Sequence, residues 1–286
     1  MSKFCKYCGK ELEDGMTCSC TGANQNEVIK EKRDGFLALF GKFVKSPVSV
    51  GASFVNNGNL KSAISLITVQ SILVGLLVIS LLNKYNSALK SMVLADEGFD
   101  TYVLSMLSTV TFPLSTAFFV SAISAFAIAC MVAFALMLVV KLFRGNTSYK
   151  YMLCVSAINS LTLIPFVALG LLISLVMPLN FDLEYLENSF DIGSVINPII
   201  TPIVISCLGM GLANYITLTV LHGGSVVDKN KEPYIMFFTG ILMGIATYFV
   251  YKIAIPMCLP SAFKTAYDAL SNGGIEAFED VINNIF

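Results

Sequence analysis

The chain has 286 residues, of which 56% are hydrophobic and 13% are charged, whereas soluble domains carry roughly 25% charged residues. This balance excludes an ordinary water-soluble domain. The formal net charge of −1 also argues against a nucleic-acid partner, because nucleic-acid-binding domains carry a basic patch.

Four cysteines stand in the first twenty residues: Cys5, Cys8, Cys18 and Cys20. The pair Cys5-x2-Cys8, followed by glycine, fits one half of a zinc knuckle, because glycine lets the backbone amides fold back toward the sulfurs. The second pair has one intervening residue where ribbons usually have two. We predict that residues 1–22 form a zinc-ribbon-like segment whose four thiolates hold one zinc per chain. A closed four-thiolate site leaves no coordination position for a substrate, so this zinc is expected to be structural.

Twenty residues are too few to build a hydrophobic core, so metal binding would be the main force that orders this segment. A tail without metal, in which the cysteines are incidental, stays open as the alternative. An iron–sulfur cluster is disfavoured because its characteristic cysteine spacing is absent.

Residues 23–34 are polar and read as a linker, and residues 35–60 then change character. Ser46 and Pro47 are typical of an N-cap followed by the first residue of a helix, which would end near Gly58. The preceding segment is predicted to form an amphipathic helix that lies on an anionic leaflet or packs on the membrane spans. Its apolar positions follow helical spacing: Phe36, Leu39, Phe40, Phe43 and Val44.

Five stretches without charge at their centres follow, and about 20 apolar residues suffice for a helix to cross a bilayer. They have no polar face, which a helix at the surface of a soluble protein needs. The fold class is therefore an all-α polytopic membrane protein. Residues 61–256 are predicted to form a five-span bundle and residues 257–286 an amphipathic tail on the outer surface. The predicted spans lie near 62–83, 115–140, 151–177, 198–221 and 234–256.

Basic residues predict the orientation, because lysine and arginine concentrate in cytoplasmic loops. Nine lie in residues 1–61, three in 141–150 and two in 222–233, against four in the alternate segments. The N-terminus is thus expected in the cytoplasm and the C-terminus outside. Lys252 fits only if its long side chain reaches the outer surface. The four N-terminal thiols would then lie in a reducing compartment, where structural disulfides are rare.

The predicted spans hold no acidic side chain, arginine or histidine at their centres, which disfavours an ion-coupled transporter. Their polar residues are expected to bond between helices: Gln70, Asn159, Thr162, Asn197, Thr201 and Asn214. Small residues four apart, at Ser121, Ala125 and Ala129 and at Gly240 and Gly244, predict close helix contacts.

Three prolines, Pro165, Pro198 and Pro202, predict kinks or broken helix ends. A cavity near Asn159, Pro165, Pro202 and Asn214 would suit a small-molecule or lipid permease. The chain contains no recognisable catalytic motif, so no enzymatic activity is expected.

The stretch "VVKLFRGNTSYKYMLCVSAINSLTLIPFVALGLLISL" resembles the middle of the Yip family of five-helix membrane proteins. There a span ends at a glycine-containing loop (here Gly145), a Ser-aromatic-basic group follows (148–150), and small residues (156–157) precede a proline (Pro165). The resemblance covers about residues 35–256. Many bacterial members join a cytosolic zinc ribbon to the membrane domain, eukaryotic members associate with Rab GTPases, and the family supplies no catalytic residues.

The basic residues include only two arginines, Arg33 and Arg144, which suits an AT-rich bacterial genome and hence the plasma membrane. We expect a non-catalytic membrane scaffold or adaptor whose cytosolic zinc ribbon binds a partner. The expected partners are the bilayer, a protein in the cytosol or membrane, and a second copy of the chain, but no nucleic acid. The alternative is a small-molecule or lipid permease with a cavity within the bundle.

Overall fold

A computed structural model describes residues 3–4, 11–12, 36–94, 107–177, 179, 192–223, 229–264 and 267–268. The chain divides into two compact units, Met1–Lys45 and Ser46–Phe286. Each unit is described by itself.

The described residues of the first unit form two short strands and one helix. Strand β1 (Lys3–Phe4) pairs antiparallel with β2 (Glu11–Leu12), and Phe4 stands opposite Glu11. Helix α1 spans Phe36–Lys45, which confirms the helix predicted from apolar spacing.

The described residues of the second unit are almost entirely helical. Five of its helices are long and apolar enough to cross a membrane, from Leu60–Ser91 to Pro233–Cys258, which confirms the five predicted spans. The helices extend past the predicted stretches because flanking polar residues continue the same hydrogen-bonded backbone. The elements are α2 (Pro47–Asn57), α3 (Leu60–Leu94), α5 (Leu114–Leu142), α6 (Tyr149–Val176), α8 (Ile192–Gly223), the 3-10 turn η2 (Lys229–Lys231) and α9 (Glu232–Cys258).

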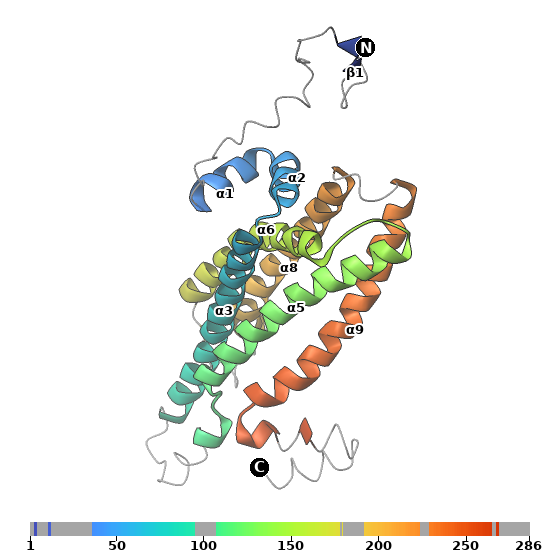
Figure 1. Ribbon diagram of the computed structural model, residues 1–286. Coiled ribbons are helices and arrows are strands. Elements are labelled where there is room, and N and C mark those ends of the chain that lie inside the picture. Colours follow the sequence, from blue (N-terminus) through green and yellow to red (C-terminus); the bar gives the residue numbers. More distant parts are fainter. Residues whose placement is uncertain are drawn as a thin grey trace. The chain divides into compact units, whose positions relative to one another are not determined.

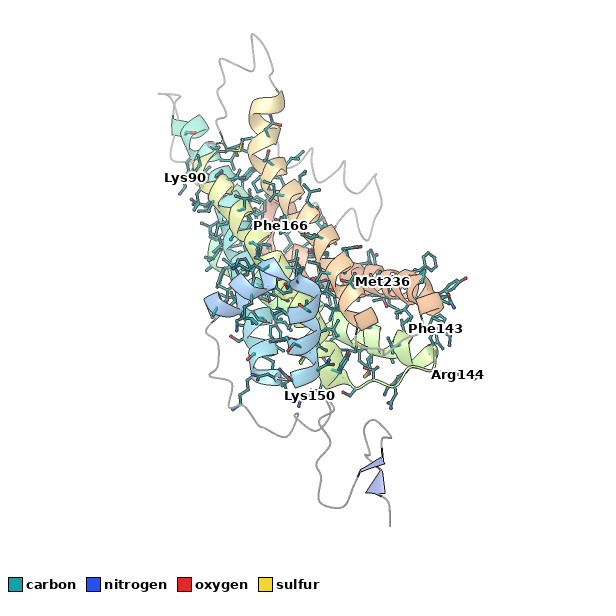
Figure 2. All side chains as sticks on the ribbon, turned by 90° about the horizontal axis from the view of Figure 1, so that it is seen from above. Lys90, Phe143, Arg144, Lys150, Phe166 and Met236 are labelled. Atoms are coloured by element: carbon teal, nitrogen blue, oxygen red, sulfur yellow. The ribbon has the colours of Figure 1, made fainter. Side chains whose placement is uncertain are left out.

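Helix α6 is the centre of the bundle and packs against α3, α5 and α8. Half of its most apolar stretch is buried, against 6% in α9. Helix α9 packs mainly along α5, and the two run side by side in Figure 1. At the end of α5, Phe143 stacks on Tyr234 of α9 with ring centroids 6.4 Å apart. Figure 2 shows Phe143 and Arg144 next to the turn of α9 that carries Met236.

Glycines mark the closest helix contacts within the bundle. A Cβ added to Gly75 would lie 2.8 Å from the Phe118 ring, and one added to Gly209 would lie 2.5 Å from the Phe166 side chain. Small residues therefore bring helices together, as membrane helices generally do, although not at every predicted position. The predicted pair Gly240 and Gly244 is wrong as a contact within this chain, because a Cβ there would meet nothing within 4 Å.

Two other predictions of local structure hold only in part, the Ser46 cap and the broken-end alternative at the prolines. Ser46 holds the N-cap position of α2 and Pro47 follows it, but the Ser46 side chain makes no capping hydrogen bond. Helices α6 and α8 continue through Pro165, Pro198 and Pro202, so none of the three prolines ends its helix. Gly58 does end α2 in the left-handed region, with φ of 58°.

The end of α5 forms a Schellman motif. Arg144 has φ of 63°, and the Gly145 N–H donates to the Val140 carbonyl over 2.8 Å. The Arg144 N–H donates to the Lys141 carbonyl over 3.0 Å. These two hydrogen bonds satisfy carbonyl groups at the end of the helix. The residue in the left-handed conformation of such a motif is usually glycine, whereas here it is Arg144.

At the other end of the bundle, Asn86 of α3 clamps the chain just before α5. Its Nδ2 donates to the Phe112 carbonyl over 3.0 Å, and the Phe112 N–H donates back to Asn86 Oδ1 over 2.9 Å. Two residues earlier along α3, Lys84 donates to the Met177 carbonyl at the end of α6. These bonds tie three helix ends together.

Candidate functional site

The four predicted zinc ligands, Cys5, Cys8, Cys18 and Cys20, lie outside the described residues. The strand pair nevertheless bears on them, because Phe4 and Glu11 stand opposite each other. This register brings together the two ends of the segment 5–10, which contains Cys5-x2-Cys8. Within the described part of the chain, no three histidine, cysteine or acidic side chains gather into a metal site. The zinc site therefore stays a prediction.

A layer of polar side chains joins α6 to its three neighbours. Ser160 Oγ donates to Gln70 Oε1 of α3 over 2.7 Å, and Ser156 Oγ donates to the Ala129 carbonyl of α5 over 2.7 Å. Asn159 Nδ2 donates to Asn214 Oδ1 of α8 over 3.1 Å. The predicted hydrogen bonding between helices is confirmed for Gln70, Asn159 and Asn214, and the predicted close contact is confirmed at Ala129.

These side chains lie well inside the apolar spans. Gln70 and Asn159 each stand ten residues after the first residue of their spans, Leu60 and Tyr149. Because a helix rises 1.5 Å per residue, both are about 15 Å from those ends. Asn214 stands seven residues before Leu221, the last residue of the α8 span, which is about 10 Å from that end. The layer is therefore at a depth where hydrocarbon offers no hydrogen-bond partner.

The layer changes from buried to exposed as it passes from α6 to α8. Ser156 and Ser160 are buried, Asn159 is half-buried, and Asn214 is exposed on the outer face of α8. The amide nitrogen of Asn214 makes no hydrogen bond to any residue that the structure describes. Among the described residues, the amide nitrogens of Asn214 and Gln70 are thus left without a hydrogen-bond acceptor, and that of Asn214 belongs to the exposed residue.

The four residues predicted to line a cavity do not converge. Asn159 and Asn214 meet, but Pro202 is buried and lies twelve residues from Asn214, about 18 Å along α8. Near Pro202 the two helices are in close contact, since a Cβ added to Gly170 would lie 3.0 Å from the Pro202 carbonyl oxygen. Phe166, labelled in Figure 2, follows Pro165 and fills the space against Gly209.

Sequence reasoning missed the Asn86 clamp and the Lys84 bond. The available signal was a lysine and an asparagine within one helical turn, directly after a long apolar run. Polar side chains at such a boundary commonly bond the free carbonyls of a helix end.

In the described part of the chain, five apolar helices have spanning length: a polar layer joins α3, α5 and α8 to α6, and α9 packs along α5. This is the architecture of a multi-pass membrane protein. Comparisons with protein-family models, with curated proteins and with solved structures find no match for this chain. The resemblance to the Yip family therefore stays a prediction.

Proposed function

We propose that this protein is a non-catalytic membrane scaffold or adaptor whose N-terminal segment binds a protein partner in the cytosol. The observation that carries the proposal is the use of polar groups in the bundle. The hydroxyl groups of Ser156 and Ser160 and the amides of Gln70 and Asn159 all bond between helices. Such bonds hold helices together in a membrane, and they occupy several of the polar groups that a substrate would need.

The close packing of α6 and α8 also supports a scaffold. Phe166 fills the space at Gly209, and the Pro202 backbone fills the space at Gly170. A closely packed bundle of this kind can anchor the preceding N-terminal segment to the membrane. Its proposed setting is a bacterial plasma membrane, with the N-terminus in the cytoplasm and the C-terminus outside, as the distribution of basic residues favours.

The partner-binding segment is proposed to be residues 1–22, ordered by one structural zinc. Four cysteine thiolates are a donor set that tetrahedral zinc prefers. The β1–β2 pairing supports this, since the segment that carries Cys5 and Cys8 begins and ends at paired strands. Zinc would supply folding free energy here and no catalysis.

Capture of the partner in native membranes tests the adaptor. The full-length chain is crosslinked and purified from cells, and the captured proteins are compared with those of a Cys5→Ser, Cys8→Ser variant. We expect the double variant to lose the cytosolic partner while its helix content and unfolding midpoint stay unchanged. The matched control is Cys130→Ser, Cys258→Ser, which leaves the proposed ribbon intact and should keep the partner. A partner that persists both in the double variant and after deletion of residues 1–33 would refute the adaptor.

The orientation has its own test. After metal is stripped, an impermeant thiol reagent is added to intact cells and the modified cysteines are identified. Modification of Cys258 with protection of the first four cysteines is the expected result. The reverse pattern would invert the proposed arrangement in the membrane.

A permease is the second candidate, and the exposed Asn159–Asn214 pair is the observation that favours it. In this case flux of the transported compound should survive Cys5→Ser, Cys8→Ser and be lost in Asn159→Leu. If the protein is an adaptor, partner capture should be lost in Cys5→Ser, Cys8→Ser and should survive in Asn159→Leu. The same variants therefore distinguish the two functions.

A further inference from the structure

One face of α8 carries an exposed stripe of mixed character. Cys207, Gly211 and Asn214 are all exposed, and their spacing of four and then three residues places them on one side of a helix. Ile203, which is 45% exposed, extends the stripe by one turn. A Cβ added to Gly211 would meet nothing within 4 Å. The stripe therefore has open space above it and a polar group beside that space.

Asn214 is the unusual member of this stripe. Its Oδ1 accepts one hydrogen bond from Asn159, while its Nδ2, a donor of two hydrogen bonds, is paired with nothing among the described residues. Polar side chains inside membrane spans normally face the bundle or a partner, since lipid tails cannot accept a hydrogen bond. The exposed amide nitrogen of Asn214 is therefore free to donate to an acceptor from outside this bundle.

A second copy of the same chain supplies that acceptor. An asparagine side chain is self-complementary, with a donor nitrogen and an acceptor oxygen that has two lone pairs. Around a twofold axis the same residues face each other, so each amide meets an identical amide. Copies inserted in the same direction require the axis to run along the membrane normal, which sets the two α8 helices parallel.

We propose that α8 is a self-association surface, on which two copies pack with Gly211 at the closest approach and each Asn214 donates to the amide oxygen of the partner's Asn214. Glycine at the crossing point lets the two backbones come close, as small residues do in membrane helix pairs. This interface goes beyond the adaptor function, because it does not involve residues 1–22 or their partner.

Cys207 is a native reporter of this interface. It lies four residues from Gly211, about 6 Å along the helix, so in a parallel pair the two Cys207 thiols face each other near the crossing. Oxidation of membranes that contain the full-length chain should give a disulfide-linked dimer, and Cys207→Ala should abolish it. The matched control is Leu208→Cys in the Cys207→Ala chain, because position 208 is equally exposed but points about 100° away on a helix. We expect this control to form no dimer.

Resonance energy transfer between labelled copies in liposomes measures the affinity. Asn214→Leu should raise the dimer dissociation constant roughly 9- to 900-fold, because the symmetric pair loses two hydrogen bonds that are each worth roughly 3- to 30-fold between membrane helices. Asn214→Gln, which keeps the amide, should recover most of the affinity. Gly211→Leu should weaken the dimer as well by blocking the approach, although it meets no neighbour in its own chain. Gln70→Leu, whose amide bonds inside the bundle, should leave the dissociation constant unchanged.

Three results would overturn the proposal: a monomer at all protein-to-lipid ratios, equal crosslinking of Cys207 and Leu208→Cys, or unchanged affinity in both Asn214→Leu and Gly211→Leu. A monomer would mean that lipid or a small ligand covers Asn214. Loss of the cytosolic partner in Cys5→Ser, Cys8→Ser with an intact α8 dimer supports both proposals. Absence of a dimer in the unchanged chain, together with capture of the cytosolic partner, refutes the self-association proposal alone.

Discussion

The contact between Gly209 and Phe166 yields a quantitative prediction for Gly209→Ala. Optimal contacts between carbon atoms are about 3.5–4.0 Å, whereas the added Cβ would lie 2.5 Å from both Cβ and Cγ of Phe166. These two atoms are at the base of the side chain, so a change of ring rotamer does not remove the overlap. The α6 and α8 backbones must therefore move apart.

The expected cost follows from two opposing effects. Overpacking a filled site costs about 1–3 kcal/mol, while alanine in place of glycine favours a helix by up to about 1 kcal/mol. Gly209→Ala should therefore lower the free energy of unfolding by about 1–2 kcal/mol. Gly240→Ala gains the same helix propensity without any overlap, because nothing lies within 4 Å of its added Cβ. It should be neutral or stabilise by up to about 1 kcal/mol.

Unfolding by SDS in mixed micelles measures both variants. The chain has no tryptophan, so helical circular dichroism is a suitable signal. Phe166→Ala removes Cγ, one of the two overlapping atoms, so it should cost less in the Gly209→Ala chain than in the unchanged chain, and the double-mutant cycle gives the coupling. Equal changes in Gly209→Ala and Gly240→Ala, or no coupling to Phe166, would refute the packing argument.

Three further predictions concern helix ends and metal. Asn86→Ala removes both hydrogen bonds of the clamp and should lower the free energy of unfolding by about 1–3 kcal/mol. Asn83 is exposed, so Asn83→Ala should change the free energy of unfolding by less than about 0.5 kcal/mol. Equal changes for the two variants in micelle unfolding would contradict the clamp. Arg144→Gly should raise the free energy of unfolding by about 1 kcal/mol, because a residue other than glycine is strained in the left-handed conformation. A lower unfolding midpoint in this variant would argue against that strain. Metal analysis of the purified chain should give about one zinc, as one four-thiolate site holds one ion, with loss in Cys8→Ser and retention in Cys130→Ser. Full zinc content in Cys8→Ser would exclude the proposed site.

Much of the architecture could be predicted from local sequence. The five spans can be predicted because an apolar run of spanning length is a property of consecutive residues. Helices α1 and α2 can be predicted for the same reason. The apolar spacing of α1, and Pro47 and Gly58 at the two ends of α2, are local signals that extend over one or two helical turns. The predicted zinc ligands Cys5 and Cys8 likewise come from spacing alone, and only the strand register at Phe4 and Glu11 adds to them.

The choice of contacts within the bundle could not be predicted in this way. A span that is apolar on every side has no amphipathic periodicity, so its sequence does not indicate which face is buried. The sequence therefore offered Gly240 and Gly244 as a packing pair, while the structure places the close contacts at Gly75 and Gly209.

Membrane insertion is determined by the sequence itself, because the apolar length of each helix sets its preference for hydrocarbon. Only the tertiary structure decided that Asn159 meets Asn214 and that the latter stays exposed. The two residues are 55 positions apart, and their encounter depends on how α6 and α8 pack over their whole length.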